Sequence, residues 1–188
     1  AVYYYWKLIA RQVDGDGNGS FSNDELFKNY VINGETYNVK IKFLKNADDS
    51  SSSTFMSIGN LNESSYDDTV GKYKFKLEWD GMQVASENIK EVIWTQTSWL
   101  DNSTIQGFQE IGTSGYVTGN TSNGFFGLGA SDSSKCVIDG NGDIQANNHW
   151  WNCVGAKDKH DENTWPVGGI PGPKGLLASS MHLYIWAL

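Results

Sequence analysis

The sequence predicts an all-β fold, a jelly-roll-like sandwich with one short helix, built as a single domain over residues 1–188. Three observations predict it. Apolar and polar residues alternate with a period of two in several segments, turn signals that contain glycine separate these segments, and 13% of the residues are aromatic, a class enriched in strands. A chain of 188 residues is also long enough to bury a substantial core within one domain.

The clearest alternation runs over residues 72–79, Lys-Tyr-Lys-Phe-Lys-Leu-Glu-Trp. Aromatic and leucine side chains share one face of this segment, and three lysines and a glutamate share the other, which is the pattern of a half-buried strand. The other expected strands are residues 2–10, 39–43, 54–58, 92–97, 104–111, 125–128, 150–154 and 181–188.

One helix is expected after residue 22. Ser22 and Glu25 have the spacing of a capping box, which satisfies the first backbone donors of a helix. The apolar stripe of this helix comprises Leu26, Phe27 and Tyr30. Asn33-Gly34 is expected to end it, because both residues tolerate the left-handed conformation of a helix terminus.

Residues 14–25, Asp-Gly-Asp-Gly-Asn-Gly-Ser-Phe-Ser-Asn-Asp-Glu, resemble the twelve-residue EF-hand loop at every ligand position. The expected Ca²⁺ ligands are Asp14, Asp16, Asn18, Ser20 and Glu25. The segment before the loop has the pattern of a strand and not of a helix, so the resemblance implies a structural calcium site and not a calcium switch; an acidic solvated turn is the alternative. Residues 139–143 imitate the first five positions, but Ile144 replaces the turn glycine, so a hairpin is predicted there and a second metal is left open.

Two cysteines and four glycosylation sequons favour a secreted, extracellular protein. A turn over residues 139–143 can bring Cys136 and Cys153 together in a disulfide, and two buried thiols are the alternative. Asn18 heads a sequon but is assigned to the metal. The expected glycosylation sites are Asn62, Asn102 and Asn120. Residue 1 is alanine, so the chain is expected to be a mature form after cleavage of a signal peptide.

Charge and motif content exclude several classes of function. The net charge is −8, and the sequence lacks the clustered basic residues that bind nucleic acids or anionic membranes. No apolar run reaches the ~20 residues of a membrane-spanning helix. None of the three histidines lies in a metalloprotease or nucleophile-elbow motif. Glu78-Trp79-Asp80 partly resembles the catalytic strand of jelly-roll glycosidases, but Gln83 stands where the next carboxylate belongs. The protein is therefore predicted to be non-enzymatic.

The two terminal segments are apolar on both faces. One face can line the core, and the other must meet a ligand or a second chain, because large exposed apolar patches are uncommon on monomers. Residues 101–156 carry few charges and are rich in glycine and aromatics, which suits an apolar groove. The expected ligand-binding or interface residues are Tyr3, Tyr5, Trp6, Phe125, Phe126, Trp150, Trp151, Tyr184 and Trp186.

Residues 5–12 and 93–98, Trp150-Trp151 and residues 170–173 resemble a group of secreted marine-invertebrate β domains, and the chain loosely resembles blue sponge carotenoproteins. The resemblance implies an extended apolar ligand of carotenoid type, held in an aromatic groove or at the interface of a hetero- or homo-oligomer. The alternatives are a calcium-dependent lectin that binds a glycan, since Trp and Tyr stack on sugar rings, and a structural protein of the extracellular matrix. A lectin would show an aromatic side chain ringed by Asp, Asn or Gln, and a carotenoid carrier would show a long dry channel.

Overall fold

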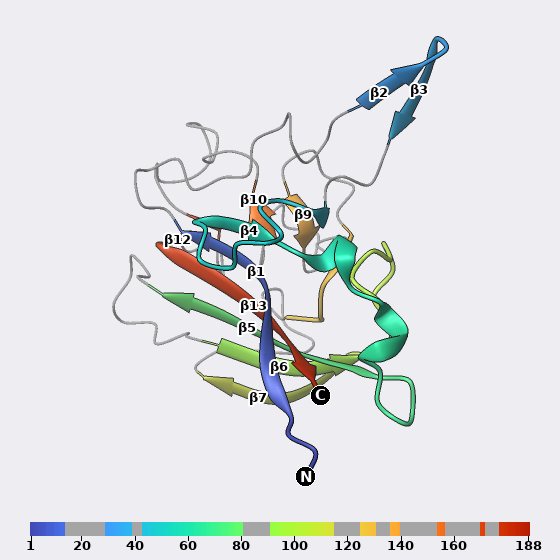
Figure 1. The fold of residues 1–188 in the computed structure, drawn as a ribbon. Coiled ribbons are helices and arrows are strands. Elements are labelled where there is room, and N and C mark those ends of the chain that lie inside the picture. Colours follow the sequence, from blue (N-terminus) through green and yellow to red (C-terminus); the bar gives the residue numbers. More distant parts are fainter. Residues whose placement is uncertain are drawn as a thin grey trace.

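The computed structural model describes residues 1–13, 29–38, 43–80, 91–114, 125–130, 136–139, 154–156, 170–171 and 177–188. A six-stranded antiparallel sheet dominates them (Figure 1). Its strands, in spatial order, are β4 (Thr54–Met56), β1 (Tyr5–Val13), β13 (Ser180–Ala187), β5 (Tyr73–Asp80), β6 (Glu91–Gln96) and β7 (Gln109–Ser114). The two terminal strands are therefore neighbours at the centre of the sheet, and Tyr5 lies opposite Ala187.

The alternating sequence of residues 72–79 forms β5 as predicted. Phe75, Leu77 and Trp79 are buried, and the residues between them are partly exposed. β13 alternates in the same way along its whole length. Since side chains of a strand alternate between faces, the larger sheet has an inner face that is dry and an outer face that is half open.

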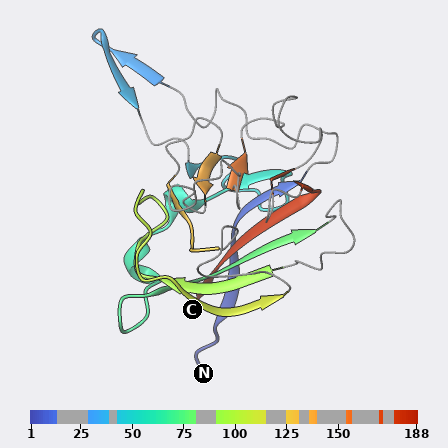
Figure 2. The same cartoon turned by 180° about the vertical axis from the view of Figure 1, so that it is seen from behind.

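A smaller antiparallel sheet contains β10 (Val154–Ala156), β9 (Cys136–Asp139) and β8 (Gly129–Ala130), and Figure 2 shows it on one side of the larger sheet. One buried apolar cluster contains Val137, Ile138 and Val154 of this sheet together with Phe75 and Trp94 of the larger sheet. The architecture is thus all-β and sandwich-like, as predicted.

A two-residue hairpin replaces the end of the predicted helix. β2 (Asn29–Ile32) pairs with β3 (Glu35–Asn38), so Tyr30 lies in a strand, and Figure 1 shows this hairpin extending away from the sheets. Asn33 and Gly34 have φ angles of 53° and 81°, the pair of positive values that a type I′ hairpin turn requires. Asn33-Gly34 is therefore a hairpin turn and not a helix terminus, and the prediction that the helix extends to it was wrong.

Three predicted strands begin later than expected, and the first of them, β1, starts at Tyr5 and not at residue 2. The segment predicted as a strand from residue 104 first forms a turn in which Gln106 N–H donates to Ser98 Oγ at 2.9 Å and Gln106 carbonyl accepts from Thr97 N–H, so β7 starts only at Gln109. Residues 125–128 precede the short β8, and Gly127 has a positive φ of 100°, which interrupts an extended strand.

The remaining elements are short. They are the 3-10 helices η2 (Ile58–Asn60) and η3 (Glu63–Ser65) and the paired strands β11 (Ile170–Pro171) and β12 (Leu177–Ala178). Across the residues that the structure describes, no helix has both the length and the apolar character that crossing a bilayer demands.

Candidate functional site

Several predicted site residues lie outside the described residues. They are Asp14, Asp16, Asn18, Ser20, Glu25, Asn120, Trp150, Trp151 and Cys153. Cys136 lies in β9 opposite Ala156, and the disulfide stays a prediction because its second cysteine is not described. Residues 140–143 of the possible second metal loop and residues 39–42 of a predicted strand also lie outside the described part.

Phe125 and Phe126 occupy different environments. Phe125 is fully buried, with its ring centroid 4.7 Å from that of Trp94 in an edge-to-face contact. Phe126 is half-buried and lies 6.1 Å from Phe108. Phe125 therefore belongs to the packed core, and only Phe126 of this pair retains surface that a ligand or partner could touch.

The outer face of the larger sheet brings together three predicted binding residues from its two terminal strands. Trp6 of β1 lies opposite Trp186 of β13, and Tyr184 lies opposite Lys76 of β5. Tyr4 packs onto the same row from just before β1. We call this surface the aromatic face, defined by Tyr4, Trp6, Lys74, Lys76, Tyr184 and Trp186.

Three rings of the aromatic face, those of Tyr4, Trp6 and Trp186, contact one another, and Tyr184 is joined to Trp6 through the ammonium group of Lys76. Tyr4 and Trp186 stack almost in parallel, with centroids 5.7 Å apart and planes 3° apart. Trp6 meets Trp186 at 4.9 Å in an edge-to-face contact. Such contacts contribute about 0.5–1.5 kcal/mol beyond the area they bury, so the row is ordered before any ligand arrives.

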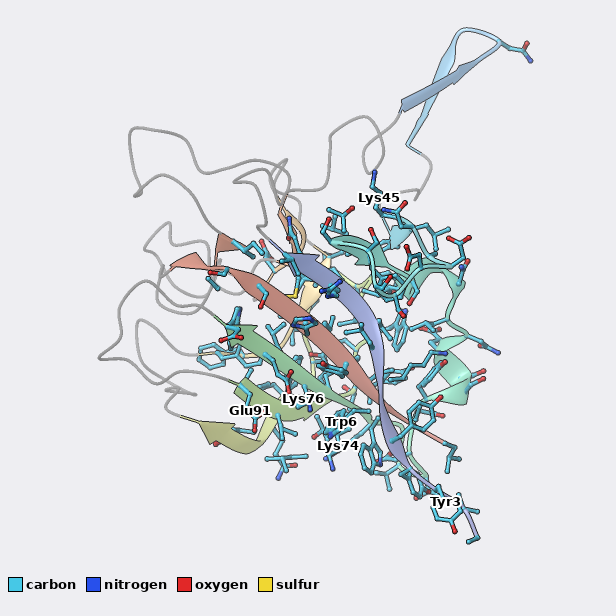
Figure 3. The ribbon with its side chains drawn as sticks, turned by 60° about the vertical axis from the view of Figure 1, so that its left-hand side comes forward. Tyr3, Trp6, Lys45, Lys74, Lys76 and Glu91 are labelled. Atoms are coloured by element: carbon cyan, nitrogen blue, oxygen red, sulfur yellow. The ribbon has the colours of Figure 1, made fainter. Side chains whose placement is uncertain are left out.

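Two lysines of β5 place their ammonium groups over these rings. Lys74 Nζ lies 4.9 Å from the Trp186 centroid and 5.7 Å from that of Trp6. Lys76 Nζ lies 4.6 Å from the Tyr184 centroid and 5.1 Å from that of Trp6. Figure 3 shows Trp6, Lys74 and Lys76 gathered on this side of the sheet. Each cation–π contact is worth about 0.5–2 kcal/mol, and the lysine stems cover part of the apolar surface.

The sequence did not single out Lys74 and Lys76. Alternation assigns both to the outer face of β5, but only the pairing of β5 with β13 reveals which aromatic rings they meet. The sequence signal that could have identified these lysines is their position on one face of β5 when aromatic residues occupy the matching face of β13.

The row ends in a polar group of side chains. Lys76 Nζ lies 2.9 Å from Glu78 Oε1. Burial, followed by the Glu78 carboxylate, raises the pKa of Tyr184, and Glu78 also accepts a hydrogen bond from the Tyr184 hydroxyl. Next to Tyr184, His182 Nε2 accepts a hydrogen bond from Arg11 Nε at 3.2 Å. A ligand along the row would therefore meet aromatic surface first and charged groups at this end.

At its opposite end the aromatic face continues into exposed apolar residues. Tyr3 is 80% exposed and Tyr4 is 56% exposed, and Figure 3 shows Tyr3 at the tip of the chain beyond β1. Tyr5 is also exposed, but it alternates with Trp6 and so points to the other side of the sheet. Among the described residues, five of the seven exposed large hydrophobic side chains lie at the two ends of the chain, which are Val2, Tyr3, Tyr4, Tyr5 and Leu188.

A separate pocket of about 360 Å³ was not foreseen from the sequence. Its apolar lining comprises Phe43, Leu44, Ile58, Leu61 and Trp99. Its polar lining comprises Asn62, Glu63 and Asp101. Behind the pocket, Trp99 contacts Tyr73 edge to face at 4.9 Å and stacks on Tyr66 at 6.4 Å. The lining comes from three separated segments, so no local period in the sequence could reveal it.

Both sequons within the described residues lie near this pocket. Asn62 is exposed, and its Oδ1 accepts a hydrogen bond from Ser64 Oγ at 2.9 Å. Asn102 is exposed beside Asp101, and its Oδ1 accepts from Thr104 N–H at 3.0 Å. The accessibility that a glycosylation acceptor requires is present at both positions.

No cluster of three or more His, Cys, Asp or Glu side chains suited to a metal occurs among the described residues. Comparisons of the chain with protein-family models, with curated proteins and with solved structures find no match.

Proposed function

We propose that this protein is a secreted, non-enzymatic binding protein with a jelly-roll-like sandwich, which holds an extended apolar molecule of carotenoid type along its aromatic face. The observation that carries the proposal is the packed group of Tyr4, Trp6 and Trp186, with Tyr184 joined to Trp6 through Lys76 and exposed apolar residues nearby at the chain ends. Flat ring surfaces in a row suit a long conjugated molecule, because such a ligand buries apolar area along its whole length.

The two lysines fit a conjugated ligand that has oxygen atoms at its ends. An ammonium group held over the rings, such as that of Lys74 or Lys76, can donate a hydrogen bond to a carbonyl or hydroxyl of the ligand. A positive charge beside a conjugated carbonyl also polarises it. Since one face of a sheet covers only one side of a ligand, we propose that a partner chain or a second copy closes the site.

Absorption spectroscopy of the protein purified from its natural source tests this proposal. A bound carotenoid would produce a visible absorption band that is shifted from the band of the extracted pigment in organic solvent. Native protein that has no visible band, and from which organic solvent extracts no lipophilic molecule detectable by mass spectrometry, would contradict it.

We further propose that Ca²⁺ stabilises the fold through the EF-hand-like loop of residues 14–25. Its oxygen ligands have the required types and spacing, and a metal bound only by the native state stabilises it by mass action. Removal of Ca²⁺ with EDTA should lower the Tm, and added Ca²⁺ should restore it. A Tm that EDTA leaves unchanged would contradict a stabilising site.

Glycan binding is the second candidate function, and the lysines of the aromatic face favour it. Trp and Tyr rings can stack on sugar rings while the ammonium groups of Lys74 and Lys76 donate to sugar hydroxyls. Binding to a panel of immobilised polysaccharides separates the two candidates. If the native protein is colourless and binds a glycan, and if the Trp6→Ala variant no longer binds that glycan, glycan binding is favoured over carotenoid binding.

A further inference from the structure

The pocket beside Trp99 has the dimensions and lining of a small-molecule site. Its volume of about 360 Å³ lies in the range of roughly 300–1,000 Å³ typical of ligand pockets. Phe43 and Ile58 are buried and form a fixed apolar floor, and the Trp99 indole supplies an aromatic wall. The described lining of the pocket shares no residue with the aromatic face.

The charge of the pocket is negative. Its nine described lining residues include the carboxylates of Glu63 and Asp101 and the amide of Asn62, and no cationic side chain is among them. Tyr73, whose ring contacts Trp99, lies close enough to these carboxylates to be affected by them. Burial raises the pKa of Tyr73, and the negative charges of Glu63, Asp67 and Asp101 raise it further. A ligand with a positive charge would therefore be favoured over a neutral or anionic one of equal size.

The same aromatic cluster already holds one ammonium group within the protein. Lys7 Nζ lies 5.7 Å from the Tyr66 centroid and donates a hydrogen bond to the Tyr66 hydroxyl at 3.1 Å. Tyr66 in turn stacks on Trp99. Lys7 is not among the described lining residues, so its ammonium group does not fill the pocket, and the small exposed part of Trp99, 8%, contributes to the pocket wall.

We propose that this pocket binds a small organic cation, a primary amine or quaternary ammonium compound. The charged nitrogen is held by Glu63 and Asp101 beside the Trp99 ring, and the apolar part of the ligand packs on Ile58 and Leu61. An organic cation fits better than a metal ion, because the two carboxylates stand beside an apolar floor and the described residues contain no group of three His, Cys, Asp or Glu side chains here.

Titration calorimetry of the full chain with choline, compared with its neutral carbon isostere 3,3-dimethylbutan-1-ol, tests the proposal. The two probes have the same shape and differ in charge. Choline should bind roughly tenfold more tightly than the isostere, and salt should weaken only the binding of choline. Glu63→Gln and Asp101→Asn should each weaken choline binding several-fold. Glu91→Gln, which removes a carboxylate of β6 outside the pocket, should leave it unchanged.

Three results would overturn the proposal. They are equal affinity for the isostere, binding of a neutral hexose in place of choline, and the absence of choline binding at millimolar concentration by protein whose melting curve shows it to be folded. The comparison of the two probes uses the unaltered chain, so it stands even where a variant folds poorly. The experiment does not involve the aromatic face, so its failure would not bear on the proposed carotenoid or glycan function.

Discussion

The two faces of the six-stranded sheet differ in how their apolar side chains are covered. The inner face is closed by the chain itself: Phe75, Leu77 and Ile185 are fully buried in one cluster with residues of the smaller sheet. On the outer face Trp6, Tyr184 and Trp186 stay partly exposed, and the lysines between them cover the rings with flexible stems. The inner face therefore determines folding, and the outer face remains available for a ligand.

The inner face also contains a buried polar anchor. Gln96 is completely buried, and its Oε1 accepts from Trp94 Nε1 at 2.8 Å and from Leu128 N–H at 3.0 Å. Its Nε2 donates to the carbonyls of Ser98 and Leu128, both at 2.8 Å. Gln96 thus ties β6 to the segment that leads into the smaller sheet. Gly127 is required beside it, because a Cβ there would lie 2.6 Å from Gln96 Oε1.

The largest effect is expected at Ile185, which points inward between two outward aromatic residues. Ile185→Asp removes buried apolar volume and places a carboxylate in a dry core, so it should cost more than about 5 kcal/mol, comparable to the whole stability of a typical domain. Circular dichroism should show an unfolded or aggregated protein. A native spectrum with a cooperative melting transition would show that the inner face is not the folding core.

A smaller loss is expected when the buried anchor is removed. Gln96→Leu keeps the volume of the side chain but leaves Trp94 N–H and both backbone groups of Leu128 without their partner, so it should lower the free energy of unfolding by about 2–3 kcal/mol. Urea denaturation measures it. Gln109→Leu, at an exposed position of β7, is the control and should change stability by less than about 0.5 kcal/mol. Equal effects of the two substitutions would show that the buried network contributes nothing.

Local periodicity predicted the sheet well, because alternation directly reports which residues share a face. It identified β5 and β13 nearly to their ends, and it correctly implied that the termini have two apolar faces. It could not identify the neighbour of each strand. The contact of Lys74 with Trp186 depends on β13 lying beside β5, a pairing of segments about a hundred residues apart.

The failures have equally physical reasons. Asn33-Gly34 suits both a helix terminus and a type I′ turn, since each needs positive φ. The spacing of the apolar residues before it predicts a helix, and that prediction was wrong. The glycine-rich surroundings of Phe125 suggest a groove, but in the structure Gly127 lies close to Gln96 and the Phe125 ring packs edge to face on Trp94. The pocket beside Trp99 arises only when three distant segments pack together.

Trp186→Asp makes the same change as Ile185→Asp one residue along β13, on the opposite face. The new carboxylate would lie in water beside Lys74, so only ring contacts are lost and stability should fall by about 1 kcal/mol. The visible absorption band, or the binding of a partner chain, should disappear. Size-exclusion chromatography and absorption spectra measure both. Retention of chromophore and partner by this folded variant would exclude the aromatic face as the site.

The smallest expected effect is a pH dependence at the polar end of the aromatic face. Burial, and then the Arg11 guanidinium, hold the pKa of His182 below its ordinary value, against weaker opposite effects of Glu78 and Asp80. The neutral imidazole is also the form that can accept the hydrogen bond from Arg11 Nε, and Arg11 in turn donates to the carbonyls of Ser51 and Ser52. Protonation of His182 would place two cations side by side and loosen the connection between the sheet and this loop.

A lowered pKa in the folded state means that the unfolded chain takes up the proton first. The contribution of His182 to stability is therefore complete above the ordinary histidine pKa of about 6.5 and is lost as the pH falls through that value toward the lower folded pKa. His182→Gln keeps an acceptor for Arg11 but cannot titrate, so its urea midpoint should fall less between pH 7.5 and pH 5.5 than that of the unaltered protein. Other groups titrate equally in both proteins, so the difference isolates His182. Identical falls would show that this end of the aromatic face does not sense pH.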